Sequence, residues 1–115
     1  MSLQHLSETA NAEDADRVVA NPTRAAAFLK ALAHEGRLTI LSRLATGEKS
    51  VTELEELLSS RQAAVSQQLA RLRLEGLVSH RREGKTIYYS LKGPNALRML
   101  ELLDDMFQAD SETPR

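Results

Sequence analysis

The fold is decided by residues 50–91, whose sequence is SVTELEELLSSRQAAVSQQLARLRLEGLVSHRREGKTIYYSL. Ser50 and Glu53 have the spacing of a capping box. In this arrangement the Ser hydroxyl accepts a hydrogen bond from the Glu backbone N–H, and the Glu side chain accepts one from the Ser backbone N–H. The pair therefore predicts the start of a short helix that continues to about Leu58.

A second capping box follows at Ser59 and Gln62, and it predicts a longer helix that extends to about Glu75. Gly76 is expected to end this helix, because glycine adopts the left-handed conformation found at many helix C-termini. The tight turn between the two helices spans about residues 58–61. Two helices joined in this way are typical of a helix-turn-helix, which places its second helix in the major groove of DNA.

The hydrophobic period changes from helical to strand-like after this point. Residues 77–82 and 85–91 are short runs rich in Val, Ile, Tyr and Thr, and Glu83-Gly84 separates them. One face of the second run carries Ile87, Tyr89 and Leu91, and the other carries Thr86, Tyr88 and Ser90. The alternation predicts a β-hairpin with a basic tip.

Helices are also expected on both sides of this unit. Apolar periodicity predicts them at about residues 8–20, 22–33, 35–46 and 94–108. The polar, aperiodic ends predict disordered termini at 1–7 and 109–115 around one domain at 8–108. The predicted fold class is mainly α with a small β-hairpin wing, a winged helix-turn-helix with five helices before the hairpin and one after it.

The net charge of −1 conceals an uneven distribution of charged residues along the chain. Residues 60–92 contain seven Lys or Arg against two Glu, which gives this segment a charge of +5. Segments 1–20 and 93–115 each carry −3, and the charges within 21–59 cancel. A basic segment between acidic ends is typical of a protein with one face that binds nucleic-acid phosphates.

The second helix of the predicted motif has one apolar and one polar face. Val65, Leu69 and Leu72 follow the spacing of a stripe that packs on its own domain. On the other face, Gln can pair with adenine and Ser can contact several base edges. The residues expected to contact bases are Gln62, Ser66, Gln67 and Gln68. The alternative is a solvated polar face, but the preceding short helix and the basic hairpin favour DNA contact.

Cationic and hydroxyl side chains beside this helix and around the hairpin tip are suited to phosphate oxygens. The residues expected to contact the DNA backbone are Arg61, Arg71, Arg81, Arg82, Lys85, Thr86 and Tyr88. Charged residues on a hairpin also protect strand edges from pairing with other chains. Both roles can hold at once.

The predicted last helix has apolar residues on more sides than one small domain can cover. Two copies of the DNA-binding surface also make more phosphate contacts than one, so a homodimer is expected. The expected interface residues are Val18, Phe28, Leu97, Leu100, Leu103, Met106 and Phe107. The alternative is that the last helix is a buried core helix of a single chain.

The sequence lacks the residues that a metal-binding protein or an enzyme needs. The chain of 115 residues contains no cysteine, which excludes disulfides and thiolate metal sites. The histidines His5, His34 and His80 are not spaced as metal ligands, and no nucleophile–base pair or phosphate-binding Gly loop is present. We therefore expect no metal, no cofactor and no enzymatic activity. Without a signal peptide or the roughly 20 apolar residues of a membrane span, a cytoplasmic protein is expected.

Residues 28–91 resemble the ArsR/SmtB family of winged-helix repressors. The matching phrases are FLKALAHEGRLTI at 28–40, LEELL at 54–58, VSQQLARLRLEGL at 65–77 and RREGKTIYYSL at 81–91. The resemblance implies a homodimeric repressor that binds an inverted-repeat operator on double-stranded DNA and is released by an inducer. A winged helix used only for protein contacts or dimerisation is the alternative function.

Within the family, the phrases GEKSV and GKTIYYSL are most similar to the dithiol subgroup that responds to sulfide or oxidants. Ser42 and Gln108 stand where that subgroup has its two cysteines, so the disulfide of the subgroup cannot form here. The segment that holds the family's thiolate metal box is SVTEL at 50–54, and residues 94–108 contain no His. The inducer is therefore unknown.

Overall fold

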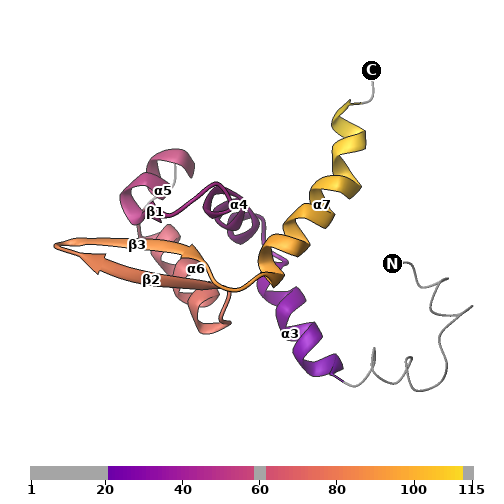
Figure 1. Ribbon diagram of the computed structural model, residues 1–115, viewed down its shortest axis with the longest axis horizontal. Helices are drawn as coiled ribbons and strands as arrows, with labels where there is room; N and C mark the ends of the chain where they lie inside the picture. Colours follow the sequence, from indigo (N-terminus) through magenta and orange to yellow (C-terminus); the bar gives the residue numbers. More distant parts are fainter. Residues whose placement is uncertain (1–20, 59–61, 113–115) are drawn as a thin grey trace, which may run out of the picture. The chain divides into compact units, whose positions relative to one another are not determined.

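The computed structural model of the chain describes residues 21–58 and 62–112, apart from the side chains of 62–63 and 109–112 (Figure 1). The helix expected over residues 8–20 lies outside the described residues, as do Val18, expected at the dimer interface, and Arg61, expected to contact phosphates. The chain divides into one compact unit up to Lys30 and another that begins at Ala31. The first unit is described only by its part of helix α3, which spans Pro22–Leu32.

The second unit has the predicted order of two helices, a hairpin and a final helix, preceded by one more helix (Figure 1). Its elements are α4 (Glu35–Leu44), β1 (Lys49–Ser50), α5 (Val51–Leu58), α6 (Gln62–Leu74), β2 (Val78–Glu83), β3 (Thr86–Leu91) and α7 (Asn95–Glu112). The mainly helical fold class with a small hairpin is therefore confirmed.

The sheet contains one strand that the sequence did not predict. Residues Lys49–Ser50 form β1, which pairs antiparallel with β3 and gives the strand order β1-β3-β2. In this register Ser50 lies opposite Tyr88, and Tyr88 lies opposite Arg81 of β2. The short strand thus ties the residues just before α5 to the middle strand of the sheet.

Helix α7 is longer than expected, since it ends at Glu112 rather than at about residue 108. The prediction of a disordered terminus from residue 109 is therefore wrong for its first four residues. Residues 109–112 are mostly polar, so the periodicity of apolar residues does not predict that the helix continues through them. The outer boundary of the domain, placed at residue 8, stays a prediction.

The core of the second unit lies between α4, α5, α6 and the sheet. Leu41, Leu54, Leu69 and Leu72 are fully buried, and Val65 and Val78 are at most 2% exposed. Burial of an aliphatic side chain of this size stabilises the folded state by roughly 1.5–3 kcal/mol. The apolar stripe predicted for α6 is therefore the face that fixes this helix to its own domain.

Local contacts at the helix ends explain why the elements begin and end where they do. The Ser50–Glu53 capping box is confirmed: the Glu53 carboxylate accepts from the Ser50 backbone N–H at 2.8 Å, and the Ser50 hydroxyl accepts from the Glu53 N–H at 3.1 Å. Gly76, with φ of +76°, follows α6 as expected. Gly84, with φ of +64°, forms the two-residue hairpin turn with Lys85, and it provides the conformation that side chains rarely adopt.

Candidate nucleic-acid interface

Helix α6 presents a polar face opposite its buried stripe. Ser66 and Gln67 are exposed, and the small Ala64 and Ala70 are exposed as well. The backbone of Gln62 lies at the first position of α6, but its side chain is outside the described residues. Ser66 and Gln67 are therefore accessible, as base-contacting residues must be.

Gln68 lies differently from these two neighbours. Its side chain is half-buried, and its Oε1 accepts a hydrogen bond at 2.9 Å from Nη1 of Arg37 on α4. Its Nε2 lies 3.4 Å from Nε2 of His34. Gln68 is thus held on the domain side of α6.

Arg71 is exposed on the same helix and forms an ion pair one turn further on. Its Nε donates to Oε2 of Glu75 at 3.2 Å, an i, i+4 contact within α6. An exposed pair of this kind contributes little to folding stability. Exchange of the carboxylate for a DNA phosphate is therefore possible at this position.

The hairpin of β2 and β3 ends in a cationic tip. Arg82 and Lys85 are exposed, and neither has an ion-pair partner in the part of the chain that the structure describes. Thr86 beside them is exposed, whereas Tyr88 further back is half-buried. The tip therefore offers two uncompensated cations and one hydroxyl to a phosphate backbone.

Arg81 lies in the same strand, but acidic groups surround it. Its Nε and Nη2 donate to the two carboxylate oxygens of Glu48, each at 2.8 Å, and its Nη1 donates to Glu83 at 2.7 Å. The guanidinium carbon lies 4.6 Å from the centre of the Tyr88 ring. Hydrogen bonding from Arg81, helped by its charge, holds the pKa of Glu48 below the usual value of 4.5. The two carboxylates in turn raise the pKa of Arg81.

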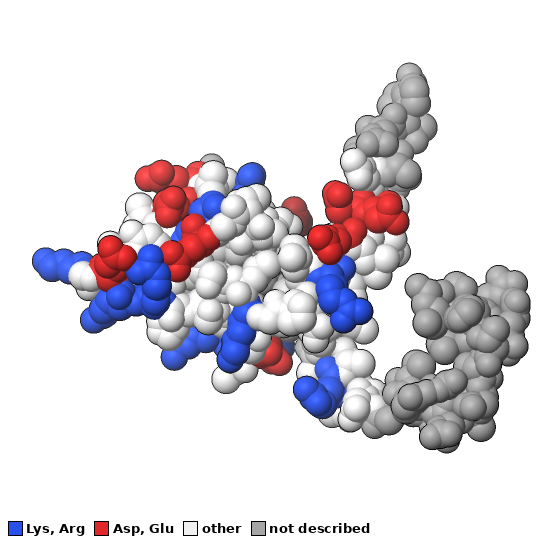
Figure 2. Space-filling model, in the orientation of Figure 1, with Lys and Arg blue, Asp and Glu red and all other residues white. Residues whose placement is uncertain are grey.

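The mixture of charges around the hairpin is visible on the surface of the molecule. Figure 2 shows Lys and Arg atoms at the free end of the hairpin and Asp and Glu atoms directly behind them. The cationic surface of the wing is therefore concentrated at its tip. Behind the tip the charges largely cancel.

Helix α7 carries an exposed apolar surface, as a dimer interface requires. Leu97, Met106 and Phe107 are exposed, by 39%, 55% and 60%, and Leu100 and Leu103 are half-buried. Leu102, which the sequence did not single out, is also exposed, by 50%. Phe28 of α3 is half-buried and belongs to the other compact unit. A single chain therefore leaves much of this surface uncovered.

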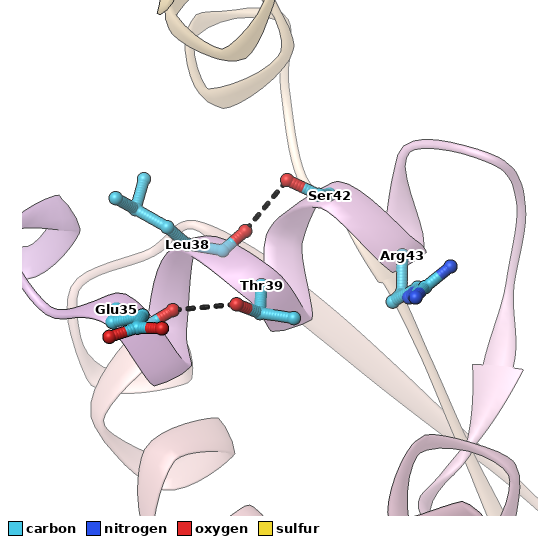
Figure 3. A pocket seen from close by; sticks show the side chains of 5 residues that line it. All are labelled: Glu35, Leu38, Thr39, Ser42 and Arg43. Carbon is cyan, nitrogen blue, oxygen red and sulfur yellow. Dashed lines mark hydrogen bonds between the residues drawn. The ribbon is translucent and has the colours of Figure 1, made fainter. Parts of the chain in front are cut away.

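A cavity of about 460 Å³ lies along α4 and includes Ser42, one of the two positions at which the dithiol subgroup has cysteine. Glu35, Leu38, Thr39 and Arg43 line the rest of it (Figure 3). The Ser42 hydroxyl donates to the Leu38 carbonyl at 2.8 Å, and Thr39 donates to the Glu35 carbonyl at 2.8 Å. Both hydroxyls are therefore turned back onto the helix. Gln108, at the second position, is exposed on α7.

The described residues contain neither a cluster of metal ligands nor a helix that could cross a membrane. Within residues 21–58 and 62–112, no three His, Cys, Asp or Glu side chains are grouped as metal ligands would be. No helix in these ranges is long and apolar enough to cross a membrane.

Three polar residues outside the predicted sites emerge only from the structure. Glu48 accepts from Arg81, Arg37 donates to Gln68, and His34 lies beside Gln68. These partners lie 31 to 34 residues apart in the sequence. No spacing rule connects side chains at that separation, so sequence patterns do not predict these partners.

Comparison with known proteins agrees with this architecture. Residues 34–80 match the model of the family described as bacterial regulatory protein, arsR family. The biofilm growth-associated repressor of Agrobacterium fabrum (strain C58) is 48% identical over 90 residues, which are 78% of this chain and 77% of the relative. The transcriptional activator HlyU of Vibrio cholerae is 44% identical over 87 residues, which are 76% of this chain and 81% of HlyU.

Solved structures show the same fold. Reduced HlyU from Vibrio cholerae superposes with a TM-score of 0.74 at 41% identity, over 80% of this chain and 97% of that one. The homodimeric winged helix-turn-helix DNA-binding domain Mb0332 from Mycobacterium bovis has a TM-score of 0.70 at 34% identity, over 86% and 90%. The chain therefore belongs to the ArsR family of winged helix-turn-helix transcriptional regulators.

Proposed function

We propose that two copies of this chain bind an inverted-repeat operator on duplex DNA and repress the adjacent genes. Helix α6 lies in the major groove, where Ser66 and Gln67 contact bases together with Gln62. The hairpin tip, with Arg82 and Lys85, lies on the phosphate backbone. The observation that carries the proposal is the exposed polar face of α6, held by a fully buried stripe and flanked by an uncompensated cationic tip.

The relatives support DNA binding over an exclusively protein-binding role. Mb0332 is described as a homodimeric DNA-binding domain, and the Agrobacterium fabrum relative as a repressor. HlyU is described as an activator, so the family contains regulators of both signs. A winged helix that had lost DNA binding would have no need for a polar face on α6 or for cations at the hairpin tip, and this chain keeps both.

Dimerisation follows from the exposed apolar residues of α7 and from the affinity that DNA binding requires. Leu97, Met106 and Phe107 become covered when α7 packs against a second copy of the chain, and burial of apolar surface drives such association. One copy neutralises few phosphates and binds weakly, whereas a dimer doubles the number of contacts. A regulator of this kind acts on chromosomal DNA in the cytoplasm and has no enzymatic activity. Release by an inducer of unknown identity completes the proposal.

The experiment that tests the proposal begins with selection of fragments of the source genome on the purified protein. Binding of the selected duplex is then measured by fluorescence anisotropy across a range of salt concentrations. We expect log K to fall linearly with log salt, because bound cations release counterions from DNA. Binding that does not depend on salt, or no binding to any duplex, would support the protein-contact alternative.

Two variants separate base contacts from backbone contacts. Lys85→Ala is expected to weaken binding to all duplexes similarly and to reduce the salt slope by about 1 for each lost phosphate contact. Gln67→Ala is expected to relax the preference at particular base pairs and to leave the slope unchanged. Identical behaviour of the two variants would contradict the assignment of these roles.

A further inference from the structure

A polar contact between α4 and α6 connects the proposed DNA-binding helix to the rest of the domain. Arg37 of α4 is half-buried, and its Nε donates to the carbonyl of Ala31 at 2.6 Å. Its Nη1 donates to Oε1 of Gln68 at 2.9 Å. The planar guanidinium thus joins the end of α3 to the middle of α6 through two hydrogen bonds in a fixed geometry.

His34 lies next to both Arg37 and Gln68. It is the N-cap of α4, and its Nδ1 accepts from the Arg37 backbone N–H at 3.3 Å. Its Nε2 lies 3.4 Å from Nε2 of Gln68. Gly36 leaves room for the ring, because a Cβ at that position would lie 3.0 Å from Cε1 of His34. The exposed imidazole therefore lies beside the Gln68 amide.

The oxygen of the Gln68 amide is accordingly occupied within the domain. The oxygen accepts from a cationic donor, and hydrogen bonds of this type are stronger than those between neutral groups. Successive residues of an α-helix are separated by about 100° around its axis. The domain side of Gln68 and the exposed side of Gln67 are therefore compatible with one orientation of α6.

We propose that Arg37 is a positioning residue that sets the rotation of α6 through Gln68, that His34 supports Arg37 by accepting from its backbone N–H, and that Gln68 does not contact DNA. The proposal rests on the function proposed above, and it removes Gln68 from the residues expected to contact bases. Bases are then contacted by Ser66 and Gln67, with Gln62 at the start of the helix. Hydrogen bonds to base edges weaken steeply with misalignment, so the rotation of α6 governs discrimination between sequences.

The charged isosteres of the two adjacent glutamines provide the sharpest test. Gln68→Glu places a carboxylate between Arg37 and His34, and we expect its affinity for the selected duplex to stay within about threefold of the wild type, since it keeps a charge-assisted hydrogen bond. Gln67→Glu, the matched control, places the same charge on the exposed face. Its affinity is expected to fall by about tenfold or more, because it loses a base contact and repels phosphates. Both variants keep the full chain and have the same formal charge, and circular dichroism verifies that each is folded.

Arg37→Ala tests the positioning role directly. We expect the ratio of affinities for the selected duplex and a scrambled duplex to fall by about tenfold, because α6 loses its fixed rotation. The slope of log K against log salt is expected to stay the same, since no phosphate contact is lost. Circular dichroism at the assay temperature verifies folding, and if Arg37→Ala is unfolded the two glutamine variants decide the question.

Several outcomes would overturn the proposal. A loss of affinity in Gln68→Glu equal to that in Gln67→Glu would show that Gln68 contacts DNA. A reduced salt slope in Arg37→Ala would make Arg37 a phosphate contact, and an unchanged specificity ratio would remove its positioning role. Failure of the wild-type protein to bind any duplex would instead refute the proposed function. That result is distinguishable because it precedes any comparison of variants.

Discussion

Replacement of Glu48 by Gln is expected to strengthen DNA binding, although Glu48 is not placed against DNA. Its carboxylate accepts two of the three hydrogen bonds that the Arg81 guanidinium donates, each at 2.8 Å. Gln keeps the shape of the side chain but removes its negative charge and one of its two acceptor oxygens. Arg81 then becomes available to a phosphate beside the cations of the hairpin tip.

The size of the effect follows from counterion release. Each additional phosphate neutralised on B-DNA makes the slope of log K against log salt steeper by about 0.9, so two wings in a dimer add up to about 1.8. Between about 200 and 50 mM salt, the ratio of variant to wild-type affinity is therefore expected to grow by about tenfold.

The assay is fluorescence anisotropy with one labelled duplex at four or more salt concentrations. Glu101→Gln is the charge-matched control, because Glu101 is exposed on α7 and away from the hairpin in sequence and structure. A double-mutant cycle with Arg81→Ala shows whether Glu48 acts through Arg81, since the effect of Glu48→Gln is then expected to shrink in that background.

Two results would refute this reasoning. An unchanged slope in Glu48→Gln would mean that DNA phosphates already displace the carboxylate in the wild-type complex. An equal change in Glu101→Gln would mean that net charge alone, rather than release of Arg81, determines the slope.

Two further predictions concern stability. Leu69→Ala is expected to lower the free energy of unfolding by about 2–5 kcal/mol, because Leu69 is completely buried. Leu74→Ala, at a position that is 82% exposed, is expected to change it by less than about 0.5 kcal/mol. Equal effects of the two substitutions in urea denaturation would contradict the packing of α6. The pKa of Glu48 is lowered by Arg81, so its contribution to stability is complete above its usual value of 4.5 and is lost as the pH falls through the lowered value. The thermal midpoint of Glu48→Gln is therefore expected to depend less on pH than that of the wild type between about pH 5 and 2, and parallel curves would argue against the ion pair.

Local sequence patterns predicted most of the fold because they depend on neighbours within one or two turns. The spacing of Val65, Leu69 and Leu72 predicted the buried face of α6, and all three are at most 2% exposed. The capping residues Ser50 and Glu53 predicted the start of α5 correctly. In each case the pattern that carries the prediction lies within seven residues of sequence.

Features that depend on distant residues were not predictable in this way. Strand β1 has only two residues, and it exists because Lys49 and Ser50 pair with Tyr89 and Tyr88, which lie far along the chain. The same reason explains why the contacts of two site residues were missed. Gln68 and Arg81 are predicted from residue type and from position in the motif, and neither shows that Arg37 or Glu48 faces them.

The exposure of the candidate residues was therefore easier to predict than their side-chain partners. The exposed positions of Ser66, Gln67, Arg82 and Lys85 agree with contacts to DNA. The contacts themselves stay a prediction, as do the dimer residues of α7. Several apolar residues of α7, among them Leu97, Met106 and Phe107, are exposed in the single chain.

Footprinting of the selected operator, combined with the stoichiometry of the complex, tests the central claim most directly. We expect two chains per duplex and two protected major-groove segments whose centres lie about 10–10.5 base pairs apart, since a dimer places its two α6 helices one helical turn apart. One chain per duplex, or a single protected segment, would contradict the account.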